Sequence, residues 1–128
     1  MRASGPVFIV DDDRDIRETL AEVLEEKGFE VITAKNGSEA LKILRGMATS
    51  PSVILLDLMM PVMDGYKFLE ERREDPRIAS IPVAIITAGH GVDPTRLGNG
   101  APIIPKPIDM PQLVGFLQGL VGAAGASS

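Results

Sequence analysis

The stretch VFIVDDDRD, residues 7–15, sets four apolar residues directly against three consecutive aspartates. Residues 7–10 are apolar enough to form a strand in the middle of a sheet. Asp11, Asp12 and Asp13 then place like charges side by side, and two such charges about 4 Å apart repel by about 1 kcal/mol in water and by more where water is excluded. Either one aspartate caps the next helix and the others are solvated, or a positive group compensates the cluster.

The composition is that of one globular domain. The 128 residues predict a single domain, 1–128, with a folded part at about 6–121 and a flexible tail at 122–128. Hydrophobic residues make up 45% of the chain, but no apolar run is long enough to span a bilayer, and the N-terminal MRASGP lacks the apolar core of a signal peptide. We therefore expect a cytoplasmic protein, with which the absence of cysteine is compatible.

The charge balance argues against a direct nucleic-acid partner. The net charge is -5, and the basic residues are scattered among acids, as in EERRED at 70–75. A nucleic-acid surface needs clustered lysine and arginine. Neither nucleic acid nor a membrane is therefore an expected partner.

Short β-branched runs alternate with amphipathic segments along the chain. The candidate strands, all interpreted as buried, are residues 7–10, 30–34, 53–56, 82–87 and 103–104. The candidate helices are residues 14–27, 38–46, 65–74 and 110–121. This alternation predicts an α/β fold with a single doubly wound parallel sheet of five strands, because continuously apolar strands need helices on both faces.

Residue types favoured as helix N-caps stand before two of these helices. Asp13 immediately precedes the first helix, and Ser38 stands at the start of the second. Asp13 is therefore expected to cap a helix and not to bind a ligand.

Polar residues follow the apolar run at four of the five strand ends. These residues are Asp11 with Asp12, then Asp57, Thr87 and Lys106. In a doubly wound sheet, ligands bind outside the carboxyl ends of the strands, and the flavodoxin-like order 2-1-3-4-5 makes the first and third strands neighbours. The three carboxylates are therefore expected to lie together.

Four motifs resemble the receiver domain of two-component response regulators. They are VDDD at 10–13, LLDLMMPVMDG at 55–65, IITA at 85–88 and PKP at 105–107. Each motif alone is weak, but their order and their places at strand ends make the resemblance specific. It extends over about residues 6–121 of this sequence.

The resemblance implies a role for each polar strand end. Asp57 would be the phosphorylated residue, Thr87 would contact the phosphoryl group, and Lys106 would pair with it. The implied ligands of a divalent cation are Asp11, Asp12, Asp57 and the backbone carbonyl of Met59. Oxygen ligands without cysteine or clustered histidine suit Mg²⁺, or Mn²⁺ as a substitute. The missing positive charge would then be the metal plus Lys106.

The family donor is a phosphohistidine on a sensor histidine kinase or a histidine phosphotransfer protein. Carboxylates can act as nucleophiles that form aspartyl-phosphates, and the catalysis is mainly positioning and charge stabilisation. The resemblance places the donor against Arg14, Arg17, Pro107 and Ile108. It implies a signalling switch, a monomer or weak dimer, that catalyses its own phosphorylation and dephosphorylation and is not a metabolic enzyme.

The region 89–107 departs from the family pattern. It is rich in glycine and proline, only 94–98 could make a helical turn, and the fourth helix is therefore expected to be shortened or missing. The family usually carries Tyr or Phe three residues before the lysine, and here that position is Ile103. His90, the only histidine, is interpreted as solvated. We expect low local stability in this region.

Two other functions fit parts of the pattern. Ile103 and the Gly/Pro-rich loop are compatible with a phosphorylation-independent interaction module that keeps the receiver fold. A metal-dependent phosphatase of the haloacid-dehalogenase type is weaker, because Asp57 is followed by Leu58-Met59 and the Asp-x-Asp pattern is absent. The sequence permits, but does not require, a cis Lys106–Pro107 bond.

Overall fold

One parallel sheet organises the protein. The computed structural model describes residues 5–60, 62–88, 92–97 and 101–126. His90, which we interpret as solvated, lies outside the described residues. The strand order is β2-β1-β3-β4-β5, and every neighbouring pair is parallel. The strands are β1 (Val7–Val10), β2 (Val31–Ala34), β3 (Val53–Asp57), β4 (Val83–Thr87) and β5 (Ile103–Pro105). The predicted doubly wound sheet and its order are confirmed.

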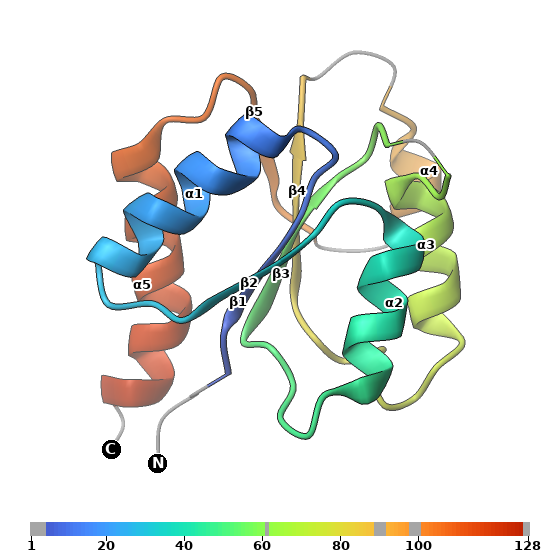
Figure 1. The fold of residues 1–128 in the computed structure, drawn as a ribbon, viewed down its shortest axis with the longest axis horizontal. Coiled ribbons are helices and arrows are strands. Elements are labelled where there is room, and N and C mark those ends of the chain that lie inside the picture. The colour runs from blue at the N-terminus through green and yellow to red at the C-terminus, as the bar shows by residue number, and fades with distance from the viewer. Residues whose placement is uncertain (1–4, 61, 89–91, 98–100, 127–128) are drawn as a thin grey trace.

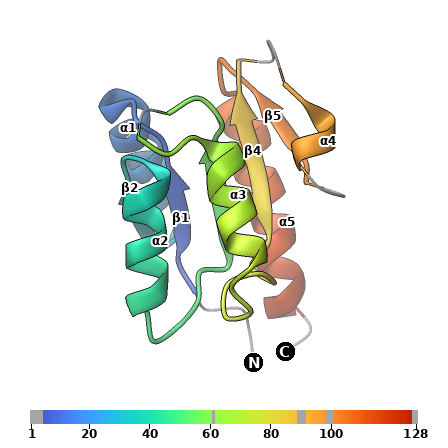
Figure 2. The same cartoon turned by 90° about the vertical axis from the view of Figure 1, so that its right-hand side faces the viewer.

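Helices cover both faces of this sheet. They are α1 (Arg14–Glu26), α2 (Gly37–Gly46), α3 (Gly65–Arg73), α4 (Pro94–Leu97) and α5 (Met110–Ala126). Helices α1 and α5 lie on one face, and α2, α3 and α4 lie on the other (Figure 1). The view turned by 90° separates the same two layers (Figure 2). Within the described part of the chain, none of these helices combines the length and the apolarity needed to cross a membrane.

Alternate residues of the central strands supply two cores. Phe8 and Val10 belong to the cluster under α2 and α3, whereas Val7 and Ile9 belong to the cluster under α1 and α5. All residues of β1, β3 and β4 are buried. This burial on both faces explains why the three strands are apolar throughout.

The expectation that all five strands are buried is wrong for the two outer ones. Thr33 in β2 is exposed, and Ile103 in β5 keeps 49% of its surface exposed. Each outer strand has a neighbour on one side only, and the short α4 offers little cover. Position in the sheet, and not the apolar character of the segment, decides burial here.

The main differences from prediction at the helix ends concern α2 and α5, while α1 and α3 each end one residue earlier than predicted. Helix α2 begins after Asn36, whose Oδ1 accepts a hydrogen bond from the Glu39 N–H at 2.8 Å, so the prediction of Ser38 as N-cap is wrong. Helix α5 continues to Ala126 instead of ending at 121. The Asp13 cap is confirmed, because its Oδ1 accepts from two N–H groups of the first turn of α1.

Helix α4 is reduced to four residues and rests on α3. The Tyr66 hydroxyl accepts a hydrogen bond from the Asp93 N–H at 2.7 Å. The Arg96 guanidinium lies 4.4 Å from the centre of the Tyr66 ring and forms an ion pair with Glu70 at 3.1 Å. Leu97 is the buried apolar anchor of this helix. The prediction of a shortened fourth helix is confirmed.

Candidate functional site

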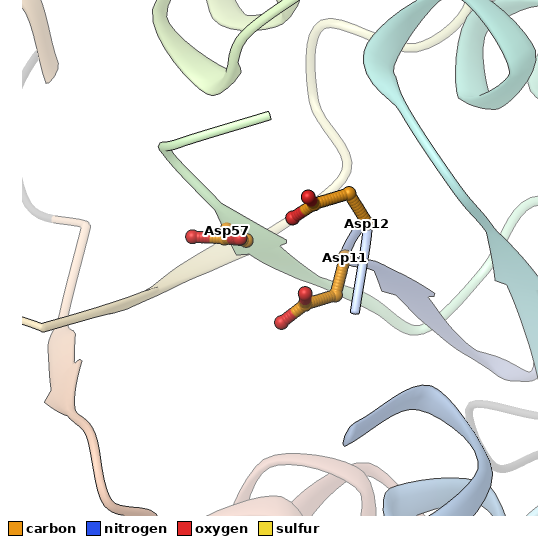
Figure 3. Close-up of side chains that lie close together, drawn as sticks. All are labelled: Asp11, Asp12 and Asp57. Carbon is orange, nitrogen blue, oxygen red and sulfur yellow. The ribbon is translucent and has the colours of Figure 1, made fainter. Parts of the chain in front are cut away.

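Three carboxylates meet at the carboxyl edge of β1 and β3. Asp11 and Asp12 follow β1, and Asp57 ends the neighbouring β3 (Figure 3). One oxygen from each carboxylate can be chosen so that all three lie within 4.8 Å of one another. Asp11 and Asp57 are buried, whereas Asp12 is exposed. The structure therefore brings together the three acidic residues that the sequence singled out.

Lys106 supplies positive charge to this cluster. Its Nζ lies 3.2 Å from Oδ2 of Asp11 and 3.6 Å from Oδ2 of Asp57. The backbone N–H of Lys106 donates to the carbonyl of Thr87 at 2.8 Å, which ties the start of this loop to the end of β4. Thr87 is itself buried, and the Lys106–Pro107 bond is cis. Both polar residues predicted after β4 and β5 therefore lie at the same edge.

The electrostatic balance at Asp57 still favours a further positive charge. Burial, followed by the nearby Asp11 carboxylate, raises the pKa of Asp57 from 3.8 to about 6, although Lys106 acts in the opposite direction. Burial alone lowers the pKa of Lys106, but the carboxylates of Asp11 and Asp57 outweigh it and raise the pKa overall. One ammonium group therefore leaves the cluster with excess negative charge. The all-oxygen set is compatible with a divalent cation.

The loop after β3 shapes the other wall of the site. The backbone N–H of Met59 donates to Oδ1 of Asp57 at 3.2 Å, while the Met59 side chain is exposed. The N–H of Gly65 donates to the Leu58 carbonyl at 2.9 Å. A Cβ at Gly65 would lie 2.7 Å from the Asp57 carbonyl oxygen, so this close approach needs glycine.

Arg17 is a site residue whose role the sequence did not indicate. Its Nη1 donates to the backbone carbonyl of Asp11 at 2.8 Å. The resemblance placed Arg17 on the donor-facing surface, but the side chain is half-buried and points back to the end of β1. No motif marks this contact, because a carbonyl acceptor has no sequence signature.

The comparisons with known proteins agree with this fold. The family model described as the response regulator receiver domain matches residues 7–118. The chain is 35% identical over 127 residues to response regulator Rre1 of Synechocystis, a match covering 95% of this chain and 54% of that protein. It is also 35% identical over 125 residues to the transcriptional regulatory protein CpxR homolog of Haemophilus influenzae, covering 95% and 52% of the two.

Solved structures of the same kind superpose on the chain. The chemotaxis response regulator CheY4 of Vibrio cholerae gives a TM-score of 0.77 at 30% identity, covering 91% of this chain and 98% of that one. TrrA of Thermotoga maritima, solved in complex with Mg(2+)-BeF, gives 0.76 at 29% identity, covering 91% and 98%.

The chain spans about half the length of the two curated relatives. Receiver domains of response regulators interact with histidine kinases or phosphotransfer proteins. Because the family model covers most of the chain and the relatives match 95% of it, the chain belongs to the response regulator receiver domains of two-component systems.

Proposed function

We propose that Asp57 accepts a phosphoryl group from a phosphohistidine donor in a Mg²⁺-dependent reaction, and that this changes the surface offered to a partner. One observation carries the proposal: the buried Asp57 carboxylate lies close to a second buried carboxylate, that of Asp11, and the Lys106 ammonium contacts both. A structural ion pair needs one acid, whereas this arrangement gathers three acids about one lysine.

In this reaction, a carboxylate oxygen of Asp57 attacks the phosphorus atom. The bond from phosphorus to the donor nitrogen breaks as the new P–O bond forms, and the imidazole leaves with its electron pair and takes up a proton. Lys106, already 3.6 Å from Oδ2 of Asp57, balances charge on the transferred group. The Thr87 hydroxyl contacts the phosphoryl group. The Met59 N–H holds Oδ1 of Asp57 and so orients the carboxylate before attack.

The donor set fits a hard divalent cation. The groups that would hold Mg²⁺, or Mn²⁺ in its place, are Asp11, Asp12, Asp57 and the backbone carbonyl of Met59. When bound, the ion supplies positive charge to the phosphoryl oxygens. Support comes from the excess negative charge at Asp57 and from the Mg(2+)-BeF complex of the related TrrA.

An apolar groove beside Lys106 suits a protein donor. Its volume is about 320 Å³, and its lining residues are Asp15, Ile16, Thr19, Leu20, Lys106, Pro107, Ile108 and Met110. We propose that a sensor histidine kinase or a histidine phosphotransfer protein docks here and presents its phosphohistidine to Asp57. The exchange would take place in the cytoplasm, with which the absence of cysteine is compatible.

Phosphorylation by acetyl phosphate tests the acceptor and the metal. The intact mass of the wild type should rise by one phosphoryl group with Mg²⁺ and not with a chelator, and Asp57→Asn should stay unlabelled. Asp13→Asn is the matched control: it replaces a neighbouring carboxylate outside the cluster by another N-cap residue, so labelling should persist. Labelling of Asp57→Asn, or an unlabelled wild type, would contradict the proposal.

A protein donor tests docking at this surface, to which the family resemblance assigns Arg14, the chain neighbour of the lining residue Asp15. Arg14 is exposed and pairs only with Glu18 among the described ion pairs, so Arg14→Glu should slow transfer from a histidine phosphotransfer protein and leave labelling by acetyl phosphate unchanged. Equal loss with both donors would indicate damage to the site and no role in docking.

A further inference from the structure

The peptide that joins Asp11 to Asp12 is held by a contact from outside the acidic cluster. Arg17, in the second turn of α1, donates from Nη1 to the Asp11 carbonyl at 2.8 Å. The Arg17 side chain is half-buried, and its backbone N–H bonds to the Asp13 carbonyl at 3.0 Å. The guanidinium is thus brought back over the end of β1 by the first turns of the helix.

Every polar group of Asp11 has a partner. Its N–H donates to the Ala34 carbonyl at 3.1 Å, and its Oδ1 accepts from the Asp13 N–H at 2.9 Å. Its Oδ2 faces Lys106, and its carbonyl accepts from Arg17. The first three contacts fix the strand end and the Asp11 carboxylate. Among the described residues, the Arg17 contact is the one that acts on the carbonyl, which belongs to the peptide plane leading into Asp12.

The orientation of that plane sets where Asp12 points. Asp12 is exposed, so burial does not fix its side chain, yet one of its carboxylate oxygens lies within 4.8 Å of oxygens from the two buried acids. A rotated Asp11–Asp12 peptide would carry the Asp12 carboxylate away from this position. A charged donor on the carbonyl is the strongest hydrogen bond available to prevent the rotation.

We propose that Arg17 is a positioning residue, which holds the Asp11–Asp12 peptide so that the two carboxylates and Asp57 converge on one divalent cation. This inference rests on the proposed function, in which the acidic cluster binds Mg²⁺. It assigns Arg17 to the site itself and not to donor recognition.

Calorimetric titration with Mg²⁺ alone tests the inference, since no phosphorylation is needed. Arg17→Gln should weaken Mg²⁺ binding about tenfold, because the charged donor to the carbonyl is lost. Arg17→Lys should restore part of the affinity, since a cationic donor remains. Lys27→Gln, which removes an exposed cation at the C-cap of the same helix, should bind Mg²⁺ like the wild type.

A second readout is independent of the metal. The amide chemical shifts of Asp12 and Asp13 in Mg²⁺-free protein should move in Arg17→Gln and not in Lys27→Gln, because only the first frees the peptide. Melting temperatures report whether each variant folds. If Arg17→Gln does not fold, Arg17→Met takes its place, because it keeps the aliphatic stem without a donor, and a Mg²⁺ affinity equal to that of the wild type overturns the inference.

The outcomes separate this inference from the function on which it rests. A wild type that does not bind Mg²⁺ would overturn the proposed function together with it. If the wild type binds Mg²⁺ and folded Arg17→Gln binds it with equal affinity, the positioning role alone is overturned. Slower transfer from a phosphotransfer protein, with Mg²⁺ affinity and amide shifts unchanged, would also overturn it and return Arg17 to the docking surface.

Discussion

The edge formed by β1 and β3 and the segment around α4 are built in opposite ways. The edge belongs to central strands that are buried on both faces, and its site residues are tied by several hydrogen bonds and ion pairs. In the part that the structure describes, residues 92–97 rest on α3 through one tyrosine, one exposed ion pair and the buried Leu97. The candidate site, whose chemistry needs fixed distances, lies on the β1–β3 edge. The α4 segment has few contacts that must break when it moves.

Truncating one buried leucine in each region gives the largest expected contrast. Leu56 in β3 is fully buried between neighbouring strands, so Leu56→Ala should lower the free energy of unfolding by about 3–4 kcal/mol. Leu97→Ala should cost only about 1–2 kcal/mol, because a four-residue helix can relax into the space. Urea unfolding measures both. Equal losses would break the comparison by showing that α4 is as tightly packed as the central sheet.

Removing the Asp57 charge should sharpen the comparison between the two regions, because it reveals the charge repulsion at the acidic edge of β1 and β3. The folded-state pKa of Asp57, about 6, exceeds its ordinary 3.8, so the folded protein binds this proton more tightly than the unfolded chain. The stability from that proton is complete below pH 3.8 and is lost as the pH rises through about 6. In metal-free buffer, Asp57→Asn should therefore be more stable than the wild type by roughly 2 kcal/mol at about pH 8.

The pH profile supplies the check. The stability gain of Asp57→Asn should shrink at about pH 4, where the wild-type carboxyl is largely protonated, and Asp13→Asn should show no comparable gain. Thermal melts at several pH values with a chelator measure both. A gain that is the same at every pH would rule out relief of charge as its cause.

The smallest expected effect belongs to the contacts between α3 and α4. Arg96→Gln removes the exposed ion pair with Glu70 and the contact of the guanidinium with the Tyr66 ring, and should lower global stability by less than about 1 kcal/mol. Amide exchange at residues 92–97 should nevertheless accelerate, while exchange in β1 stays unchanged. Lys67→Gln, which removes only exposed ion pairs within α3, is the matched control. Unchanged exchange at 92–97 would mean that Leu97 and the Tyr66–Asp93 hydrogen bond hold α4 without help from Arg96.

The sequence determined the features that depend on local pattern. Apolar runs and helical spacing predicted the strands and the alternating fold, and Asp13 could be identified as a cap because its hydrogen bonds go to the next turn. The sequence also predicted that the three carboxylates lie close together, because parallel strands in the expected order end at the same edge of the sheet. The shortened α4 was predicted from the glycine and proline content of region 89–107.

Only the tertiary structure decided the contacts that join distant or unmarked atoms. Asn36, and not Ser38, caps α2. The start of this helix lies against Met63, and neither sequence segment indicates that the two come close together. Tyr66 accepts from the N–H of Asp93, and Arg17 donates to a carbonyl of Asp11. Backbone donors and acceptors are the same in every residue, so which of them a side chain reaches depends on the folded chain and not on a motif.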